Sequence, residues 1–576
     1  MGRYKNFTAA IYCPVGNLID IKDFDSFEKQ FEWIEKHVKI GKVYLETYRH
    51  GVLIEREHME KVKQFFINRG IAVSGGITTD APPDGEGGFD PLCYTSPETE
   101  KLMAKVSAFT ASLFDEVILD DFYFTNCKCP SCIEKKGEQS WADFRVALMR
   151  EFSKNVILKE AKQANPKVKM IIKFPNWYEH FQDSGYNLAD EPGIFDAIYT
   201  GTETRNPTYT QQHLPKYLSY FNMRYMESIA PGRNGGGWFD PYECTYNLTS
   251  YAEQAQLTLL AKAREAMMFC LGSLLEAEYS LCAPVAGQVF EDMDAYLDEL
   301  GSPIGTPAYI PFHSHGEDFI HNYIGMIGIP LEPTPVYPEN AKQLFLAQSA
   351  AMDGDILEKI KKSLMNGADV IVTSGFVKET LGKGFEHIVN VGIGGKKAVV
   401  NKYAYSCDGG VTFGGCAESA AQIMVPQLSF QTNDTWELIA GLGEDNNFPI
   451  LLKNLYGKGR VYILTIPEDC GNLYNYPRTI LNIIRQIFSP DFSVQLDAFA
   501  KLGFFAYDND CFVLHSFQHY YDDITFSVPG ENSVVEDIVN GNRLIGQNID
   551  GKTRFSLRMQ PGINRVFRIR KRGSSL

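Results

Sequence analysis

The stretch Val117-Ile118-Leu119-Asp120-Asp121-Phe122-Tyr123-Phe124-Thr125-Asn126-Cys127-Lys128-Cys129-Pro130-Ser131-Cys132 contains the signals that decide the fold. Its first three residues are apolar, as in a short buried strand, and two acids stand at the carboxyl end of that strand. Three aromatic residues and then three closely spaced cysteines follow. The stretch therefore places a candidate reacting group beside a candidate structural metal site.

Around this stretch, short apolar runs alternate with amphipathic helical stretches from the N-terminus to about residue 302. Strands are predicted at Thr8–Cys13, Val43–Glu46, Ile71–Ser74, Val117–Asp121, Val168–Phe174, Ala197–Tyr199, Met223–Glu227 and Met268–Leu274. Helices are predicted at Phe24–His37, Glu57–Asn68, Glu98–Leu113, Ser140–Gln163, Leu214–Phe221 and Tyr251–Ala266. Eight such repeats fit a (β/α)8 barrel, although a doubly wound α/β sheet would give the same alternation.

The positions of the acids favour the barrel. Glu46, Asp121 and Glu227 stand at the ends of predicted strands, and Glu203 and Glu276 follow two others. In a barrel all these strand ends converge on one mouth, where catalytic groups lie. We therefore expect an α/β chain whose residues 1–302 form a (β/α)8 TIM barrel.

The remainder of the chain has two further patterns. Strand and helix signals alternate from 303 to 490, which indicates a flavodoxin-like α/β domain. From 491 to 576 short strands alternate with turns such as Asp508-Asn509-Asp510 and Gly541-Asn542, which predicts a small C-terminal all-β domain of the β-sandwich kind.

Charge and composition limit the partners. The chain has 576 residues and a formal charge of −16, and nucleic acid or an anionic membrane surface would require basic surface. Membrane-spanning helices need roughly 18 apolar residues in a row, and the sequence has no such run. The N-terminus lacks the apolar core of a secretory signal. We expect a cytoplasmic protein with no nucleic-acid or membrane partner.

The cysteines Cys127, Cys129 and Cys132 form a C-x-C-x-x-C run, one thiol short of a closed tetrahedral zinc site. Cys93 lies in the loop after the third strand, which neighbours the loop after the fourth in a barrel. We therefore expect these four thiols to bind a structural Zn²⁺ that leaves no open coordination position. Unligated reduced thiols and a redox pair are the alternatives.

Two acids of the mouth fit the cleavage of glycosidic bonds, which in most families requires a carboxyl group on each side of the scissile bond. Asp121 and Glu227, on the fourth and seventh predicted strands, would face each other across the mouth. The alternative is that each of them caps a helix or pairs with an arginine.

At this point the residues resemble a known family. The segment Cys93-Tyr94-Thr95-Ser96-Pro97, the strand with its acids, the cysteine run and Phe144-Arg145 in the next helix look like the zinc-bearing region of the family 42 glycoside hydrolases, the bacterial β-galactosidases. A second segment, Tyr225-Met226-Glu227-Ser228-Ile229-Ala230-Pro231-Gly232-Arg233-Asn234, followed by Trp238, resembles that family's Met-Glu-Gln-x-Pro-Gly segment.

The resemblance implies a function and a mechanism. It makes Asp121 the general acid/base and Glu227 the nucleophile of a retaining, exo-acting glycosidase that cleaves small oligosaccharides or glycosides. It also implies a structural zinc without a catalytic cofactor, and a trimerisation-type domain in a homotrimer or another homo-oligomer such as a dimer. The sequence departs from the family at Asp120, which replaces an Asn that contacts the sugar 2-hydroxyl, and at Asp121, which replaces Glu.

Other residues near the predicted strand ends are candidates for contacts with the sugar. We expect the substrate-binding residues to be Asp120, Glu46, Arg49, Lys173, Asn176, Trp177, Glu203, Arg205, Trp238 and Glu276. The cationic Lys173, Arg205 and Arg233 are compatible with an acidic sugar, and equally with neutralisation of the carboxylates.

Three other interpretations stay open. The fold could carry an inverting glycosidase or a glycoside phosphorylase, in which Glu227 is no nucleophile. The protein could be a catalytically inactive sugar-binding protein. The two acids could also be Asp121 and Glu203, as in barrel α-glycosidases whose acids follow strands four and six.

Overall fold

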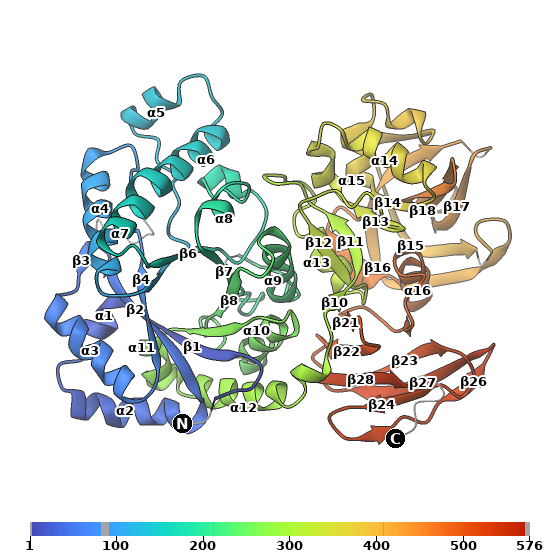
Figure 1. The fold of residues 1–576 in the computed structure, drawn as a ribbon. Coiled ribbons are helices and arrows are strands. Elements are labelled where there is room, and N and C mark those ends of the chain that lie inside the picture. Colours follow the sequence, from blue (N-terminus) through green and yellow to red (C-terminus); the bar gives the residue numbers. More distant parts are fainter. Residues whose placement is uncertain (1–2, 82–90, 211, 407, 432, 571–576) are drawn as a thin grey trace. The chain divides into compact units, whose positions relative to one another are not determined.

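The computed structural model describes residues 3–81, 91–210, 212–406, 408–431 and 433–570 (Figure 1). The chain divides into two compact units, Met1–Asp298 and Glu299–Leu576. Within the described ranges, none of the helices has the length and apolar character needed to cross a membrane.

The first unit is built on a closed barrel of eight parallel strands. These are β1 (Thr8–Cys13), β2 (Ile40–Arg49), β4 (Ala72–Ile77), β5 (Glu116–Leu119), β6 (Lys169–Phe174), β7 (Ala197–Gly201), β8 (Asn234–Phe239) and β9 (Glu265–Phe269). The barrel closes because β1 pairs with β2 on one side and with β9 on the other. The predicted (β/α)8 barrel is confirmed.

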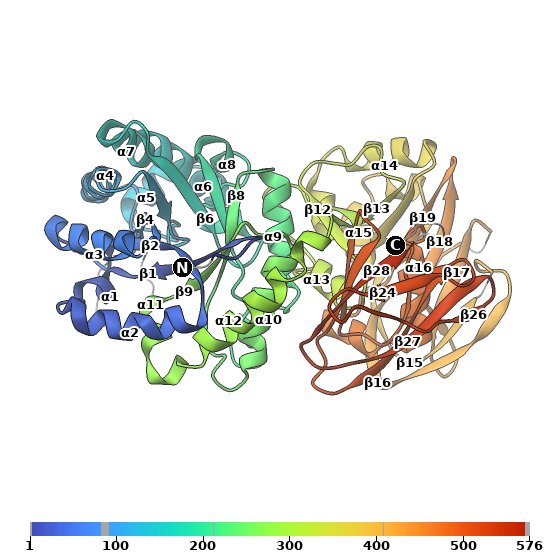
Figure 2. The same ribbon diagram turned by 60° about the horizontal axis from the view of Figure 1, so that its bottom comes forward.

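Helices surround the barrel strands (Figure 2). The first long one, α2 (Phe24–His37), shows why they form: the Asp23 carboxylate accepts a hydrogen bond from the backbone N–H of Asp25, and Phe27, Phe31 and Ile34 recur at helical spacing and are buried. The ring continues with α3 (Arg56–Asn68), α4 (Pro97–Ala111), α6 (Trp141–Phe152), α7 (Lys159–Ala164), α9 (Leu218–Ile229), α10 (Leu248–Leu260) and α12 (Cys282–Asp294).

The prediction of the seventh strand was wrong. Residues 223–227 belong to helix α9, and the strand is β8, which begins at Asn234. This strand reads Asn-Gly-Gly-Gly-Trp-Phe because its neighbours approach closely: a Cβ on Gly236 would lie 2.3 Å from the carbonyl oxygen of Glu265, and one on Gly237 would lie 2.3 Å from Thr258 Cγ2. Glycine is required here, and it removes the apolar, β-branched signature by which strands are predicted.

Other element boundaries also differ from those predicted. The eighth strand is β9, and the residues after it form helix α11 (Leu271–Leu275) in place of the predicted Met268–Leu274 strand. Helix α10 ends at Leu260, before the predicted end at Ala266. Strand β5 ends at Leu119, so Asp120 and Asp121 lie just beyond the regular strand.

The second unit contains a nine-stranded mixed sheet. Its parallel part has the order β12 (Leu331–Thr334), β11 (Thr306–Tyr309), β13 (Gln343–Leu346), β14 (Asp369–Thr373) and β19 (Gly459–Leu464). Numbered along the chain this order is 2-1-3-4-5, the flavodoxin-like order. Four antiparallel strands that the sequence analysis did not include extend the sheet: β18 (Asn447–Tyr456), β17 (Thr435–Leu442), β15 (Val391–Ser406) and β16 (Phe413–Phe430).

The unit also contains the helices α13 (Ile320–Gly325), α14 (Ile356–Met365), α15 (Ser374–Thr380) and α16 (Arg478–Phe488), and two further sheets, both antiparallel. One consists of β10 (Pro303–Ile304), β21 (Leu502–Tyr507), β22 (Cys511–Ser516), β28 (Asn564–Arg570), β24 (Val534–Asp537) and β25 (Asn542–Arg543). The other consists of β20 (Gln495–Asp497), β23 (Asp522–Pro529), β27 (Lys552–Met559) and β26 (Gln547–Ile549). Phe504, Phe512, Phe526 and Phe567 belong to their shared core. The domain boundaries at residues 302 and 490 stay predictions.

Candidate active site

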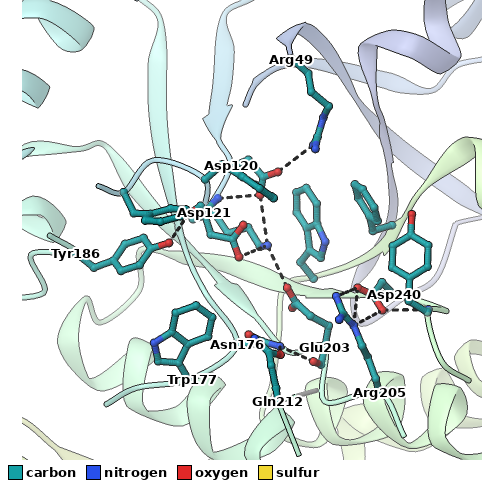
Figure 3. Close-up of a pocket in the computed structure, with 16 residues that line it drawn as sticks. Arg49, Asp120, Asp121, Asn176, Trp177, Tyr186, Glu203, Arg205, Gln212 and Asp240 are labelled. Atoms are coloured by element: carbon teal, nitrogen blue, oxygen red, sulfur yellow. Dashed lines mark hydrogen bonds and ion pairs between the residues drawn. The ribbon is translucent and has the colours of Figure 1, made fainter. Parts of the chain in front are cut away.

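A cavity of about 460 Å³ lies at the carboxyl-end mouth of the barrel (Figure 3). The residues that line it come from loops and strand ends around the mouth: Arg49, Asp120, Asp121, Phe122, Phe124, Lys173, Asn176, Trp177, Tyr186, Glu203, Arg205, Gln212, Trp238, Asp240, Tyr242 and Phe269. Nine of the residues predicted from sequence are therefore in one pocket: Asp120, Asp121, Arg49, Lys173, Asn176, Trp177, Glu203, Arg205 and Trp238.

Asp120 is the more enclosed of the two adjacent acids. Its carboxylate accepts hydrogen bonds from Arg49 Nη2 at 3.1 Å, from Lys173 Nζ at 3.4 Å and from the backbone N–H of Asp121 at 2.8 Å. Burial by itself would raise the pKa of Asp120, but Lys173 and Arg49 outweigh it and the pKa is lowered. Asp120 is thus an anion that orients its neighbours.

Asp121 has the opposite electrostatic character. Burial raises its pKa well above the usual range for an aspartate; Lys173 opposes this, while the charges of Asp120 and Glu203 add to it. Its Oδ2 atom accepts a hydrogen bond of 2.9 Å from Lys173 Nζ, and the Tyr186 hydroxyl donates to its backbone carbonyl. A raised pKa favours the protonated form of the carboxyl group, and a general acid requires that form.

Lys173, at the end of β6, connects the acids of the pocket. Besides the two aspartates, its ammonium group contacts Glu203 Oε1 at 3.2 Å, and it lies 4.1 Å from the centroid of the Trp238 ring. The side chain is only 2% exposed. Burial would lower the pKa of Lys173, but the negative charges of Asp121, Glu203 and Asp120 outweigh it and the pKa is raised. Lys173 is therefore a permanent cation. The pKa of Glu203 is also raised, chiefly by burial.

Asp240 is an acid of the site that the sequence analysis missed. It follows β8, the seventh barrel strand, and its carboxylate accepts three hydrogen bonds from the Arg205 guanidinium, at 2.8, 3.0 and 3.2 Å. Figure 3 shows Asp121 and Asp240 on opposite sides of Glu203. Asp240 occupies the strand-end position that was predicted for Glu227.

Glu227 itself lies outside the pocket. It is on helix α9, where its carboxylate accepts a hydrogen bond from the backbone N–H of Gly232 at 2.8 Å and forms an ion pair with Arg264 at 3.3 Å. Arg233 donates to the carbonyl oxygens of Pro192 and Phe195. The prediction that Glu227 is the nucleophile at a strand end is therefore corrected: the Met-Glu segment has helical spacing, and the helix directs this acid away from the barrel mouth.

Two further residues that were predicted to contact the sugar do not line this pocket. Glu46 is fully buried beneath the pocket, where it accepts hydrogen bonds from Tyr12 Oη and the Val15 N–H, both at 2.7 Å, and from Arg49 Nε. It holds Arg49 in place and does not line the pocket. Glu276 is exposed and lines a different, adjoining cavity.

Aromatic side chains form much of the pocket wall. Trp177 and Trp238 were predicted; Phe122, Phe124, Tyr186, Tyr242 and Phe269 were not. The run Phe122-Tyr123-Phe124 directly after the acids was an available signal, whereas Tyr186 comes from a distant loop. Aromatic faces and a few placed polar groups, such as Asn176, are what a sugar ring requires from a binding pocket.

The four predicted zinc ligands lie together. The ligand atoms of Cys93, Cys127, Cys129 and Cys132 are all within 4.8 Å of one another, and Cys93 Sγ lies 3.6 Å from Cys129 Sγ and 3.7 Å from Cys132 Sγ. Four sulfurs around a tetrahedral Zn²⁺ with bonds of about 2.3 Å would be about 3.8 Å apart. The cluster therefore fits a metal ion.

A (β/α)8 barrel with acids and aromatic side chains gathered at its mouth is the architecture of a glycoside hydrolase catalytic domain. The chain belongs to the family whose model is described as a probable glycosyl hydrolase catalytic domain, which matches residues 1–291. Residues 301–469 match the second domain of the uncharacterized protein SSO3021, and residues 493–569 match a probable glycosyl hydrolase C-terminal domain.

Whole-chain comparisons extend this result. SSO3021 of Saccharolobus solfataricus is 25% identical over 527 residues, which cover 84% of this chain and 86% of that protein. Among solved structures, α-L-fucosidase isoenzyme 2 from Paenibacillus thiaminolyticus matches with a TM-score of 0.68 and 11% identity over 99% of both chains. The β-galactosidase of Rahnella sp. R3 matches at 0.66 and 11%, and Gan42B, a GH42 β-galactosidase, at 0.65 and 12%, each over 98% of both chains. These likenesses confirm the family 42-like fold.

Proposed function

We propose that the protein is a glycosidase that hydrolyses small oligosaccharides or glycosides from one end, with Asp121 as the general acid/base. The observation that carries this proposal is a pair of carboxyl groups in one pocket: Asp121, whose raised pKa favours the protonated acid, and Asp240, which forms an ion pair with Arg205. Two acids with separate roles are what glycosidic cleavage requires.

Asp240 is the better candidate for the second acid. It follows the seventh barrel strand and Asp121 follows the fourth, so they belong to opposite parts of the strand circle. Glu203 is the alternative partner, because it contacts the same Lys173 ammonium as Asp121. The raised pKa of Glu203 favours its protonated form, which is a weaker nucleophile than a carboxylate and can hydrogen-bond a sugar hydroxyl.

The reaction follows from these roles. Asp121 donates its proton to the leaving oxygen while the Asp240 carboxylate attacks the anomeric carbon. Asp121, now an anion stabilised by Lys173, then takes a proton from the water that releases the sugar from Asp240. In an inverting enzyme Asp240 would instead activate the water directly. The resemblance to family 42 favours the retaining course.

The pocket itself supports an exo-acting enzyme. Its volume lies within the range of small-molecule pockets, and buried charged groups line it. We propose that Trp177 or Trp238 stacks on the sugar ring and that Asp120, Asn176 and Glu203 hydrogen-bond its hydroxyls. The cations do not favour an acidic sugar, because each already contacts a carboxylate: Arg49 contacts Asp120, Lys173 contacts Asp121, and Arg205 contacts Asp240.

Further properties are proposals of the same kind. We propose that Cys93, Cys127, Cys129 and Cys132 hold a structural Zn²⁺, since four thiolates fill a tetrahedral site and leave no position for a reacting group. The sequence and the fold resemblance support a cytoplasmic homo-oligomer, a trimer or a dimer, that has a carbohydrate substrate and no nucleic-acid or membrane partner.

The test is a screen of aryl α- and β-glycosides of galactose, glucose, mannose, fucose, arabinose and uronic acids. On the sugar that gives activity, Asp121→Asn and Asp240→Asn should each lower kcat at least 100-fold. Glu227→Gln should stay within twofold of the wild type, because its carboxylate is outside the pocket. Azide should restore turnover of Asp240→Ala as a glycosyl azide. Loss of activity in Glu203→Gln together with activity in Asp240→Asn would reject the assignment of Asp240.

A further inference from the structure

A second cavity, of about 470 Å³, adjoins the first at the barrel mouth. The two cavities share three wall residues, Arg49, Tyr242 and Phe269, so they lie side by side. The rest of the second wall comes from the segments after strands β1, β2 and β9, among them Asn17 and Glu276. Asp121 lines only the first cavity.

One hairpin contributes residues to both cavities. Strand β2 pairs with the short strand β3 (Val52–Leu53), and the two residues between them, His50 and Gly51, have φ angles of 52° and 77°. Both residues in the left-handed region fit a tight two-residue hairpin turn. Arg49, which lines both cavities, and His50, which lines only the second, are therefore fixed relative to each other.

His50 is oriented by a buried acid. Its backbone N–H donates a hydrogen bond to Asp80 Oδ1 at 2.7 Å, and its ring Nδ1 lies 2.8 Å from Asp80 Oδ2, while the Asp80 side chain is 1% exposed. The imidazole itself is 43% exposed. The ring contact with Asp80 involves Nδ1, so Nε2 is the ring nitrogen that can form a hydrogen bond with a ligand.

The chemistry of the second wall fits a neutral, hydroxyl-rich ring. Asn17, His50, Ser273 and Glu276 supply polar atoms, and the rings of Tyr242 and Phe269 supply apolar faces. A sugar has the same combination of hydroxyl groups and apolar ring faces, which Tyr and Phe bind by stacking and polar side chains bind by hydrogen bonding.

We propose that the second cavity is a subsite for a second sugar ring. This ring would be joined to the sugar whose glycosidic bond is cleaved, on the side of that sugar away from the cleaved bond. The position of Asp121 decides on which side of the cleaved bond the second ring lies. A general acid must contact the leaving oxygen, and Asp121 lines only the first cavity, so the second cavity does not hold the leaving group. The enzyme would then release a disaccharide from the end of its substrate. This inference rests on the proposed glycosidase function.

Gly16 offers a clean way to close the second cavity. It lies in the short helix α1 (Val15–Ile19), it lines only the second cavity, and a Cβ added to it meets no atom within 4 Å. Gly16→Phe adds a large side chain at the wall of the cavity, and Gly16→Ala is the matched control that adds only a methyl group. Both exchanges also remove a helical glycine, so the fold is not expected to suffer.

The first measurement uses 4-nitrophenyl glycosides of the sugar found in the screen and of disaccharides that carry the same sugar at the aryl end. The ratio of kcat/KM for the disaccharide to kcat/KM for the monosaccharide should fall at least tenfold in Gly16→Phe and stay unchanged in Gly16→Ala. Mass spectrometry should show intact disaccharide with nitrophenol. An unchanged ratio in Gly16→Phe, or cleavage between the two sugars, would overturn the proposal.

The second measurement does not depend on turnover. Isothermal titration of Asp121→Asn with lactose, cellobiose, melibiose, mannobiose and xylobiose is compared with titration of the component monosaccharides. At least one disaccharide should bind at least tenfold more tightly than its monosaccharides, and Gly16→Phe should abolish the difference. If no disaccharide binds more tightly, the subsite is rejected. Failure of the glycosidase proposal would instead appear as the absence of hydrolysis in the screen.

Discussion

The Nζ atom of Lys173 lies 2.9 Å from Oδ2 of Asp121, so the proposed proton donor is in direct contact with a permanent cation. Burial raises the pKa of Asp121 and Lys173 opposes this rise. Because the contact limits the rise of this pKa, Asp121 can still give up its proton. The contact also stabilises the Asp121 anion that remains after the proton has left. The other contacts of the ammonium group, to Asp120 and Glu203, fix its position.

Replacement of Lys173 should change the pH profile of the enzyme. Because Lys173 lowers the pKa of Asp121, Lys173→Met should raise that pKa further and move the basic limb of kcat/KM to higher pH, while kcat falls at least tenfold. The measurement is the kcat/KM profile from pH 5 to 10. Lys173→Arg keeps the charge and should keep the limb near its original pH. An unmoved limb in Lys173→Met would show that Asp121 is not the acid that this limb reports.

The glycines of β8 should be costly to replace. A methyl group on Gly236 would lie 2.3 Å from the carbonyl oxygen of Glu265, which is backbone and cannot move without distorting β9. We expect Gly236→Ala to lower the free energy of unfolding by about 1–3 kcal/mol and to lower the Tm in calorimetry. Gly16→Ala, which meets no neighbouring atom, is the matched control and should be at least as stable as the wild type. Equal Tm values for the two variants would contradict the close approach of β8 and β9.

Glu191, a residue of the short helix α8 (Glu191–Ile194), should make stability depend on pH. Burial raises its pKa to about 8, although it accepts hydrogen bonds from Ser153 and from the Asn187 N–H. An unfolded glutamate loses its proton near pH 4.3, whereas the folded one keeps it up to about pH 8. The free energy of unfolding should therefore fall as the pH rises through this window.

Glu191→Gln removes this titration, so it should be more stable than the wild type at pH 8 by roughly 1–4 kcal/mol, with a smaller difference at pH 5. Urea unfolding at both pH values measures the change. Glu138→Gln, at an exposed position, should follow the wild type at each pH. A constant difference between Glu191→Gln and the wild type at the two pH values would refute the buried, protonated state.

The cysteine cluster should bind one zinc ion per chain. Plasma emission spectrometry of the purified protein should find one equivalent, and Cys93→Ser should lower both the zinc content and the Tm. Cys416→Ser, at an exposed cysteine outside the cluster, should alter neither. Because four thiolates would fill the coordination sphere, partial zinc loss in a protein that stays folded should leave kcat on an aryl glycoside unchanged. A protein purified without metal would contradict the site.

The barrel and one side of the pocket could be predicted from the sequence. Asp121 and three of the four cysteines lie in one continuous stretch, so the strand, the acid and the metal site could be predicted together. Asp240 could not be predicted, because the strand before it is built from glycines that close packing against β9 requires. Glu227 was predicted in its place because a Met-Glu segment resembled a strand-end motif, although this segment belongs to helix α9.

The closure of the barrel also sets the order in which the nascent chain can complete its structure. Strand β1 gains its first partner when β2 has been synthesised, but its other edge pairs only with β9, whose last residue is Phe269. Until the ribosome has released that segment, one row of backbone N–H and C=O groups on β1 stays without its strand partner. During translation this edge therefore stays open until the last barrel strand has been made, and an open strand edge can pair with another chain.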